Sequence, residues 1–139
     1  MVNIQEIFTA RRGCYMKQND TNTAIVELKK LAEKFREDRE WKKFHTPHAL
    51  AINITVEAAE LLELFTWLDP QKFEARFTTN SCYREKIEEE LGDVIHACLA
   101  FANQLELDVT QTFLKKLEKT SQKYPVNEVK GIATKHFKD

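Results

Sequence analysis

Glycine, proline and cysteine are all scarce in this chain, which has 139 residues and only three of each. Few helix breakers, together with abundant Leu, Ala, Glu and Lys, predict an all-α protein. The cysteines, Cys14, Cys82 and Cys98, are odd in number and lack CxxC spacing. This pattern favours reduced thiols in a cytoplasmic protein over a disulfide framework or a zinc site.

The chain also lacks an excess of charge of either sign and any long hydrophobic run. Twenty-one basic and 22 acidic residues give a formal net charge of −1. Without a basic field, a nucleic-acid polymer is not expected as a partner. No apolar run could span a bilayer, and residues 1–17 lack the apolar core of a signal peptide. We therefore expect no membrane partner.

Four segments with helical periodicity predict a helical bundle of one domain. Residues 1–19 show no sustained periodicity and are expected to form a loose N-terminal arm, and residues 126–139 a C-terminal tail around a domain at 20–125. The second helix, preceded by the Thr46-Pro47 capping pair, is apolar on several sides, which predicts a subunit interface and an obligate oligomer. The four expected helices cover 24–40, 47–67, 83–105 and 108–123, and capping residues at 20–23 precede the first of them. A further short helix is expected near Phe73 and Phe77.

Two pairs of acidic residues, each spaced three apart, stand out in the second and third helices. Glu57 and Glu60 form one pair, and Glu90 and Asp93 form the other. Residues three apart project from one side of a helix, here on stripes otherwise occupied by apolar side chains. Acidic residues of this kind are usually solvated and paired with lysines. On an apolar stripe an unpaired carboxylate is costly, so four converging carboxylates favour a divalent cation among them.

Carboxylate oxygens suit Mg²⁺ or Mn²⁺ rather than zinc. Such a centre, holding one to three ions, best supports displacement at a phosphoryl group by an activated water. Glu60 or Asp93 could hold or deprotonate that water, and the pattern does not choose between them.

Aromatic and basic residues near the acidic pairs are candidates for binding the rest of a nucleotide. Trp41 and Trp67 flank the second helix and could stack on a planar base, although large aromatic residues often simply pack in a core. His45 beside Trp41 is favoured as a packing or hydrogen-bonding residue rather than a metal ligand. Lys116 and Lys123 on the last helix are candidates to meet phosphates.

Four segments together resemble a known family. They are Trp41-Lys-Lys-Phe-His45-Thr-Pro47, Glu57-Ala-Ala-Glu60 with Trp67 following, Glu89-Glu90-Leu-Gly-Asp93 and Lys123-Tyr124-Pro125. In order and spacing, the stretch from Glu33 to Pro125 is similar to the MazG-like all-α NTP pyrophosphatase superfamily, most of all to the branch containing the dCTP pyrophosphatases.

The resemblance implies Mg²⁺-dependent hydrolysis of a nucleoside triphosphate between its α and β phosphates, by a helical subunit that forms a dimer or a dimer of dimers. Removal of unwanted dNTPs, with dCTP or a modified dCTP favoured, is the activity that it suggests. By position, the two acidic pairs match the metal ligands, and Glu60 and Asp93 are the expected catalytic residues. The positions matching the nucleotide-binding residues are Trp41, Trp67, Lys116, Lys123 and Tyr124.

Three positions depart from the family pattern. Ala97 stands where a tyrosine is common, with His96 beside it, Thr120 stands where an asparagine is usual, and Ala32 occupies the place of a pocket histidine. These departures leave the metal centre intact but bear on base identity and affinity. Hydrolysis of another nucleotide, or a regulatory protein that binds nucleotide without turnover, are the alternative interpretations.

Overall fold

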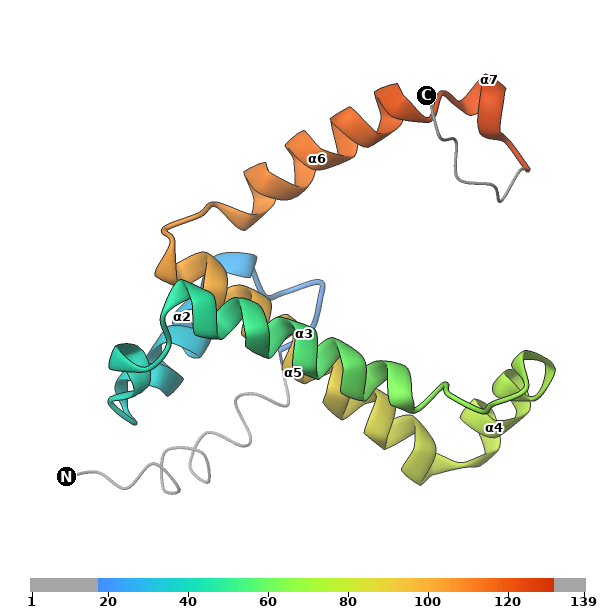
Figure 1. Ribbon diagram of the computed structural model, residues 1–139, viewed down its shortest axis with the longest axis horizontal. Coiled ribbons are helices and arrows are strands. Elements are labelled where there is room, and N and C mark those ends of the chain that lie inside the picture. Colours follow the sequence, from blue (N-terminus) through green and yellow to red (C-terminus); the bar gives the residue numbers. More distant parts are fainter. Residues whose placement is uncertain (1–17, 132–139) are drawn as a thin grey trace. The chain divides into compact units, whose positions relative to one another are not determined.

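A computed structural model describes residues 18–131, and every regular element within that range is a helix. The prediction of an all-α protein is therefore confirmed for the described residues. The chain divides into two compact units, Met1–Glu106 and Leu107–Asp139 (Figure 1). The predicted single domain at 20–125 crosses this division and remains a prediction.

Helices α3 (Pro47–Glu63) and α5 (Ser81–Gln104) form the centre of the first unit. They lie side by side and run in opposite directions (Figure 1). Thr46, as expected, caps α3 by accepting a hydrogen bond from the amide of Ala49 at 3.2 Å. The Tyr83 hydroxyl donates to the carbonyl of Leu64 at 2.8 Å, which joins the start of α5 to the end of α3. This pairing brings the two acidic segments to the same level.

Helix α2 (Ile25–Glu37) packs against the C-terminal half of α5. The contact is close because the buried core there is built largely from small side chains, including Ala32, Ala97 and Ala100. The side-chain amide of Asn103 donates to the carbonyl of Lys29 at 2.8 Å. The fully buried guanidinium of Arg36 donates to the carbonyl of Ala100 at 3.1 Å. Polar bonds across this interface thus fix the position of α2 on α5.

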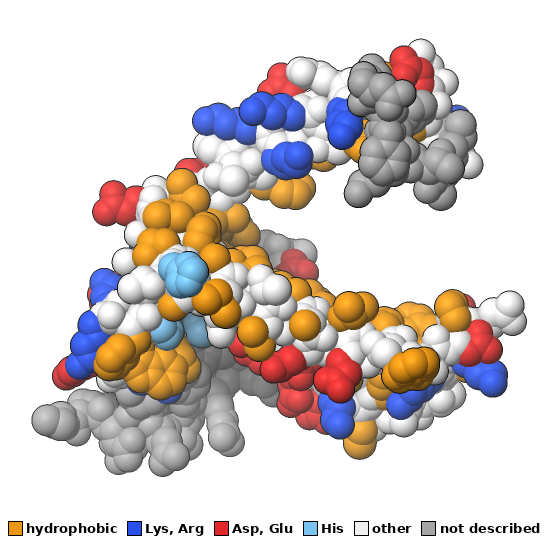
Figure 2. Space-filling model, in the orientation of Figure 1, with side chains coloured by type: hydrophobic (Ala, Val, Ile, Leu, Met, Phe, Trp, Pro, Cys, Tyr) orange, Lys and Arg blue, Asp and Glu red, His pale blue; other side chains and the backbone are white. Residues whose placement is uncertain are grey.

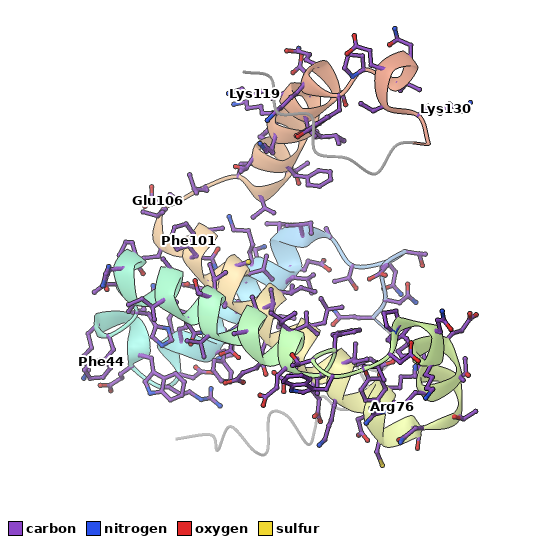
Figure 3. All side chains as sticks on the ribbon, turned by 45° about the vertical axis from the view of Figure 1, so that its right-hand side comes forward. Phe44, Arg76, Phe101, Glu106, Lys119 and Lys130 are labelled. Atoms are coloured by element: carbon purple, nitrogen blue, oxygen red, sulfur yellow. The ribbon has the colours of Figure 1, made fainter. Side chains whose placement is uncertain are left out.

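Two 3₁₀ helices and a short α-helix complete the first unit. They are η1 (Trp41–Lys43), η2 (Pro70–Lys72) and α4 (Phe73–Thr79). The predicted short helix near Phe73 is confirmed, and the ring of Phe73 stacks on that of Phe77 at a centroid distance of 5.6 Å. Figure 3 shows Phe44, directly after η1, and Arg76 of α4 at opposite ends of this unit.

Several expected helix boundaries differ from the observed ones, among them the end of α2, which is Glu37 rather than Glu40. The capping residues at 20–23 do not cap α2, whose N-cap is Ala24 without a side-chain bond. They form a turn instead, in which the Asn22 side chain accepts from the amide of Asn19 at 2.7 Å. Helix α3 ends at Glu63 rather than at Trp67, and Trp67 itself is left-handed with φ of 64°. Local turn chemistry therefore competes with helix extension before α2 and after α3.

The second unit contains helices α6 (Val109–Lys123) and α7 (Val126–Val129). Asp108 caps α6 as expected, accepting from the amide of Gln111 at 2.7 Å. The helix ends at the predicted Tyr124-Pro125 stop. Three exposed apolar side chains repeat along α6 at helical spacing, and no other element among residues 107–131 covers them: Phe113, Leu114 and Leu117.

Other expectations concern residues beyond the described range. The predicted arm at 1–19 and tail at 126–139 lie largely outside it, as does Cys14. Cys82 and Cys98 are both free thiols. Within residues 18–131, no helix combines the length and apolar character needed to cross a lipid bilayer.

Candidate metal centre and aromatic pocket

Three of the four predicted metal ligands come together between α3 and α5. Glu57, Glu90 and Asp93 each offer a carboxylate oxygen, and these atoms all lie within 4.8 Å of one another. Glu57 and Glu90 are partly buried and Asp93 is exposed. Figure 2 shows acidic side chains gathered along this helix pair. The antiparallel packing of α3 on α5 brings one carboxylate of the first pair and both of the second into one acidic group, called here the acidic triplet.

Glu60 lies outside the acidic triplet. It is exposed on α3, one helical turn beyond Glu57, and its charge nevertheless acts on Glu90. Side chains three apart on a helix are neighbours, so Glu60 borders the group without sharing its centre.

The electrostatics of the triplet are unfavourable for three bare carboxylates. Partial burial raises the pKa of Glu90 above its ordinary value, and the negative charges of Glu60 and Asp93 raise it further. Glu57 and Glu89 act in the same direction. A cation bound beside Glu90 would be favourable, because its positive charge would offset the repulsion between these neighbouring negative charges.

The donor set of the triplet fits a divalent cation with hard oxygen ligands. Opposite ligands of Mg²⁺ stand about 4.2 Å apart, since each oxygen lies about 2.1 Å from the ion. The observed limit of 4.8 Å is within a small side-chain adjustment of that span. Nitrogen and sulfur donors, which zinc prefers, are absent from the triplet. Three protein oxygens would leave room for water and for phosphate oxygens.

An aromatic pocket of about 380 Å³ lies next to the triplet. This volume is within the range of about 300–1,000 Å³ typical of small-molecule sites. Glu57 belongs to both the pocket and the triplet, so the two are parts of one site. The residues that line the pocket include Phe35, Trp41, His45, Asn53, Glu57 and His96.

His45 and Trp41, both predicted to bind substrate, occupy this pocket together. Their ring centroids are 5.7 Å apart. Burial lowers the pKa of His45 below its ordinary value, and the positive charges of Arg36 and His96 lower it further. At neutral pH His45 is therefore an uncharged hydrogen-bonding group, with one ring nitrogen as donor and the other as acceptor.

His96, Asn53 and Phe35 are pocket residues that the sequence reasoning did not select. His96 follows Asp93 by three residues, so the same helical spacing that joined the acidic pairs could have placed it on the site-facing side of α5. No comparable signal marked Phe35, because its apolar position on α2 looks like any core residue.

The remaining predicted residues lie at the end of the first unit away from the pocket or belong to the second unit. Trp67 is 99% exposed and lies at the far end of α3 from the Trp41 pocket. Lys116, Lys123 and Tyr124 belong to the second unit. There the ammonium of Lys123 lies 5.4 Å from the centre of the Tyr124 ring, so that pair is formed locally.

The raised pKa of Glu90 predicts that the charged form of this residue lowers the folding stability of the metal-free protein, and that the loss depends on pH. The folded state binds this proton more tightly than the unfolded state, so stability falls as pH rises above the ordinary value of 4.5. In EDTA, Glu90→Gln should raise Tm at pH 7, and the gain should shrink toward pH 4. Added Mg²⁺ should raise the Tm of the native protein and not that of the variant. Glu85→Gln is the control. An unchanged or lower Tm for Glu90→Gln at pH 7 would show that repulsion at Glu90 does not lower the stability of the metal-free protein.

Fold and site together define an all-helical protein with a clustered-carboxylate centre beside an aromatic pocket. The model of the MazG-like family matches residues 52–139, which include both acidic pairs. The chain belongs to the MazG-like family.

Individual proteins agree with this membership. The chain is 30% identical over 117 residues to dCTP pyrophosphatase 1 of Mus musculus, covering 81% of this chain and 65% of that protein. The protein of the same name from Homo sapiens is 28% identical over the same shares. The chain thus spans about 65% of the length of these relatives. A solved pyrophosphatase from Archaeoglobus fulgidus is 33% identical, with a TM-score of 0.66 over 78% of this chain and 99% of that one.

Proposed function

We propose that the chain is a Mg²⁺-dependent nucleoside triphosphate pyrophosphohydrolase. It cleaves a dNTP between the α and β phosphates, giving a monophosphate and pyrophosphate, and so removes unwanted nucleotides from the pool. The acidic triplet and the aromatic pocket that share Glu57 carry this proposal, because clustered carboxylates beside a pocket with aromatic walls suit a metal-bound triphosphate and its base. The names of the pyrophosphatase relatives support it and favour dCTP or a modified dCTP.

The carboxylates have two tasks in this proposal. Glu57, Glu90 and Asp93 hold the cation, and Glu60 completes the ligand set from the neighbouring turn. When bound, Mg²⁺, with Mn²⁺ as an alternative, would neutralise charge on phosphate oxygens and lower the pKa of a bound water. A carboxylate oxygen of Glu60 or Asp93 accepts the proton of the attacking water. The bond between the α phosphorus and the bridging oxygen then breaks, and pyrophosphate leaves.

The base and the phosphate tail are bound by different residues. Trp41 and His45 line the base pocket, while Lys116 and the Lys123-Tyr124 pair bind phosphates. We propose that Trp67 of one copy of the chain lines the base pocket of a second copy. Its support is the indole, which is 99% exposed in the single chain and so is free to contact a second copy.

The active form in this proposal is a homo-oligomer of four-helix subunits, a dimer or a dimer of dimers. Several large apolar side chains on α3 and α5 support it, because soluble monomers rarely leave such side chains uncovered on adjacent helices. They are Ile52, Val56, Leu62, Leu91 and Ile95, all exposed in the single chain.

Charging this surface should dissociate the oligomer. A lysine in place of Val56 would be buried without a partner in the assembly, which costs several kcal/mol and should weaken association about a hundredfold or more. Light scattering coupled to size exclusion measures the mass, with Gln71→Lys on η2 as the matched control. A native protein that is monomeric, or a Val56→Lys variant with unchanged mass, would contradict the proposal.

A binding or regulatory role without turnover is the second candidate, favoured by one observation. Ala97 is 98% buried on α5 and presents only a methyl group where the family commonly has a tyrosine hydroxyl. Hydrolysis of a different nucleotide would follow from the same difference.

Pyrophosphate release from each dNTP and NTP separates these candidates. If pyrophosphate release is fastest with dCTP or one of its modified forms, the proposed substrate is supported. Another ranking reassigns the base, and metal-dependent binding with no release from any nucleotide favours the regulatory role.

A further inference from the structure

Two imidazole nitrogens in the aromatic pocket are buried without a hydrogen-bond partner. They are Nδ1 of His45 and Nε2 of His96. Leaving a buried polar atom unpaired costs about 1–3 kcal/mol, and most such atoms in folded proteins have a partner. Two of them in one pocket therefore point to a ligand that supplies the missing groups.

Packed rings hold both imidazoles in place. The ring of His96 meets that of Phe35 edge-on, with centroids 5.2 Å apart and an interplanar angle of 84°. Phe35 in turn meets Trp41 edge-on at 5.8 Å, and Trp41 contacts His45. The guanidinium of Arg39 covers the Phe35 ring at 3.6 Å. The two imidazoles are thus oriented before any ligand arrives, which limits the entropy lost on binding.

The neighbourhood of the pocket indicates which ligand would meet these nitrogens. Glu57 lines the pocket and belongs to the acidic triplet, so a molecule with phosphates at the triplet would extend its other end toward the two histidines. The walls there are flat aromatic rings, and Figure 2 shows histidine side chains among hydrophobic ones at this end of the unit. Flat walls with hydrogen-bonding groups at one side suit a planar base with a polar edge.

We infer that His96 is a specificity-determining residue whose Nε2, together with Nδ1 of His45, hydrogen-bonds the polar edge of the nucleotide base. This inference rests on the proposed function for the position of the phosphates. Uncharged His45 offers one donor and one acceptor, in agreement with its lowered pKa. A site built to hydrogen-bond a polar edge rejects an analogue that lacks it, because its own groups then stay unpaired.

A nucleotide with an apolar isostere of its base tests the inference directly. Binding is measured by calorimetry in Mg²⁺, using α,β-imido triphosphates of thymidine, of deoxycytidine and of the 2,4-difluorotoluene isostere of thymidine. The native protein should bind at least one natural pyrimidine about tenfold more tightly than the isostere, as expected for one hydrogen bond of about 1.4 kcal/mol. His96→Phe keeps a ring against Phe35 and removes both nitrogens, so it should lose this preference.

Two further variants separate recognition from packing. His96→Gln, whose side-chain amide can replace Nε2, should restore a preference for the natural base. The exposed His48 of α3 provides the matched control, and His48→Phe should bind like the native protein. Inorganic tripolyphosphate, which has no base, should bind the native protein and His96→Phe equally. A changed affinity for tripolyphosphate in His96→Phe would show damage to the metal centre and overturn the inference.

The outcomes for the inference and for the proposed function are distinct. If the native protein prefers the natural base and His96→Phe does not, but no pyrophosphate is ever released, the inference stands and hydrolysis fails. If His96→Phe keeps the full preference, or if the native protein shows none, the inference is wrong whether or not pyrophosphate is released.

Discussion

Replacing Asp93 with alanine is expected to lower pyrophosphate release at least a thousandfold while leaving the helical fold intact. Asp93 supplies one of the three clustered carboxylates and comes from an exposed position on α5, so its removal weakens metal binding and creates no cavity. Charge stabilisation by a bound metal is worth several kcal/mol, and about 4 kcal/mol corresponds to roughly a thousandfold in rate. The rate of release and the helical circular dichroism are measured on the same preparation.

Glu85→Ala is the matched control for this experiment. Glu85 is an exposed acid on the same helix and lies outside the acidic triplet. Its replacement should change the rate less than twofold. Equal losses in both variants would mean that general charge on α5, rather than the triplet, governs activity, and near-normal release by Asp93→Ala would remove that residue from the site.

Replacing Arg36 with methionine is expected to cause the largest loss of stability, about 3 kcal/mol or more. Its guanidinium is completely buried and donates to the carbonyl of Ala100 at 3.1 Å and to Gln104 Oε1 at 2.6 Å. It also meets Glu33 Oε2 at 3.2 Å. Removing one partner of a buried polar network leaves the others unpaired, which typically costs 3–5 kcal/mol for a charged group, roughly 8–15 °C in Tm for a chain of this size.

The exposed pair of Lys34 and Asp38 provides the control on the same helix. Its ammonium and carboxylate lie 2.8 Å apart, and Lys34→Ala should cost less than about 1 kcal/mol because solvent screens the pair. Chemical denaturation of both variants gives the two free energies of unfolding. A loss for Arg36→Met as small as that for Lys34→Ala would show that these bonds do not fasten α2 to α5.

Helical periodicity and acidic spacing predicted most of what positions the site. Apolar residues that recur every three or four positions located α2, α3, α5 and α6, because amphipathic helices leave a strong signal over three or more turns. The spacing of three within each acidic pair placed both carboxylates of a pair on one helix face. Assembly of Glu57, Glu90 and Asp93 into one group then needed only that α3 and α5 pack together, as they do.

Other parts of the site depend on tertiary packing that no local pattern encodes. Phe35 and His96 enter the aromatic pocket from two helices 61 positions apart in the chain, and neither carries a motif. The exposure of Trp67 follows from the early end of α3 and a left-handed residue, which the helical pattern did not predict. Buried Arg36 could not be told from a surface arginine, since two of its partners, Ala100 and Gln104, lie on α5.

Product analysis of the native protein with dCTP and Mg²⁺ tests the central claim most directly. The account predicts equal amounts of dCMP and pyrophosphate, no dCDP or free phosphate, and complete loss of both products in EDTA with recovery on adding Mg²⁺. Release of dCDP with phosphate would mean cleavage between the β and γ phosphates instead of between α and β. Release that persists in EDTA, or no product from dCTP or any other nucleotide by a folded protein, would contradict a metal-dependent pyrophosphohydrolase.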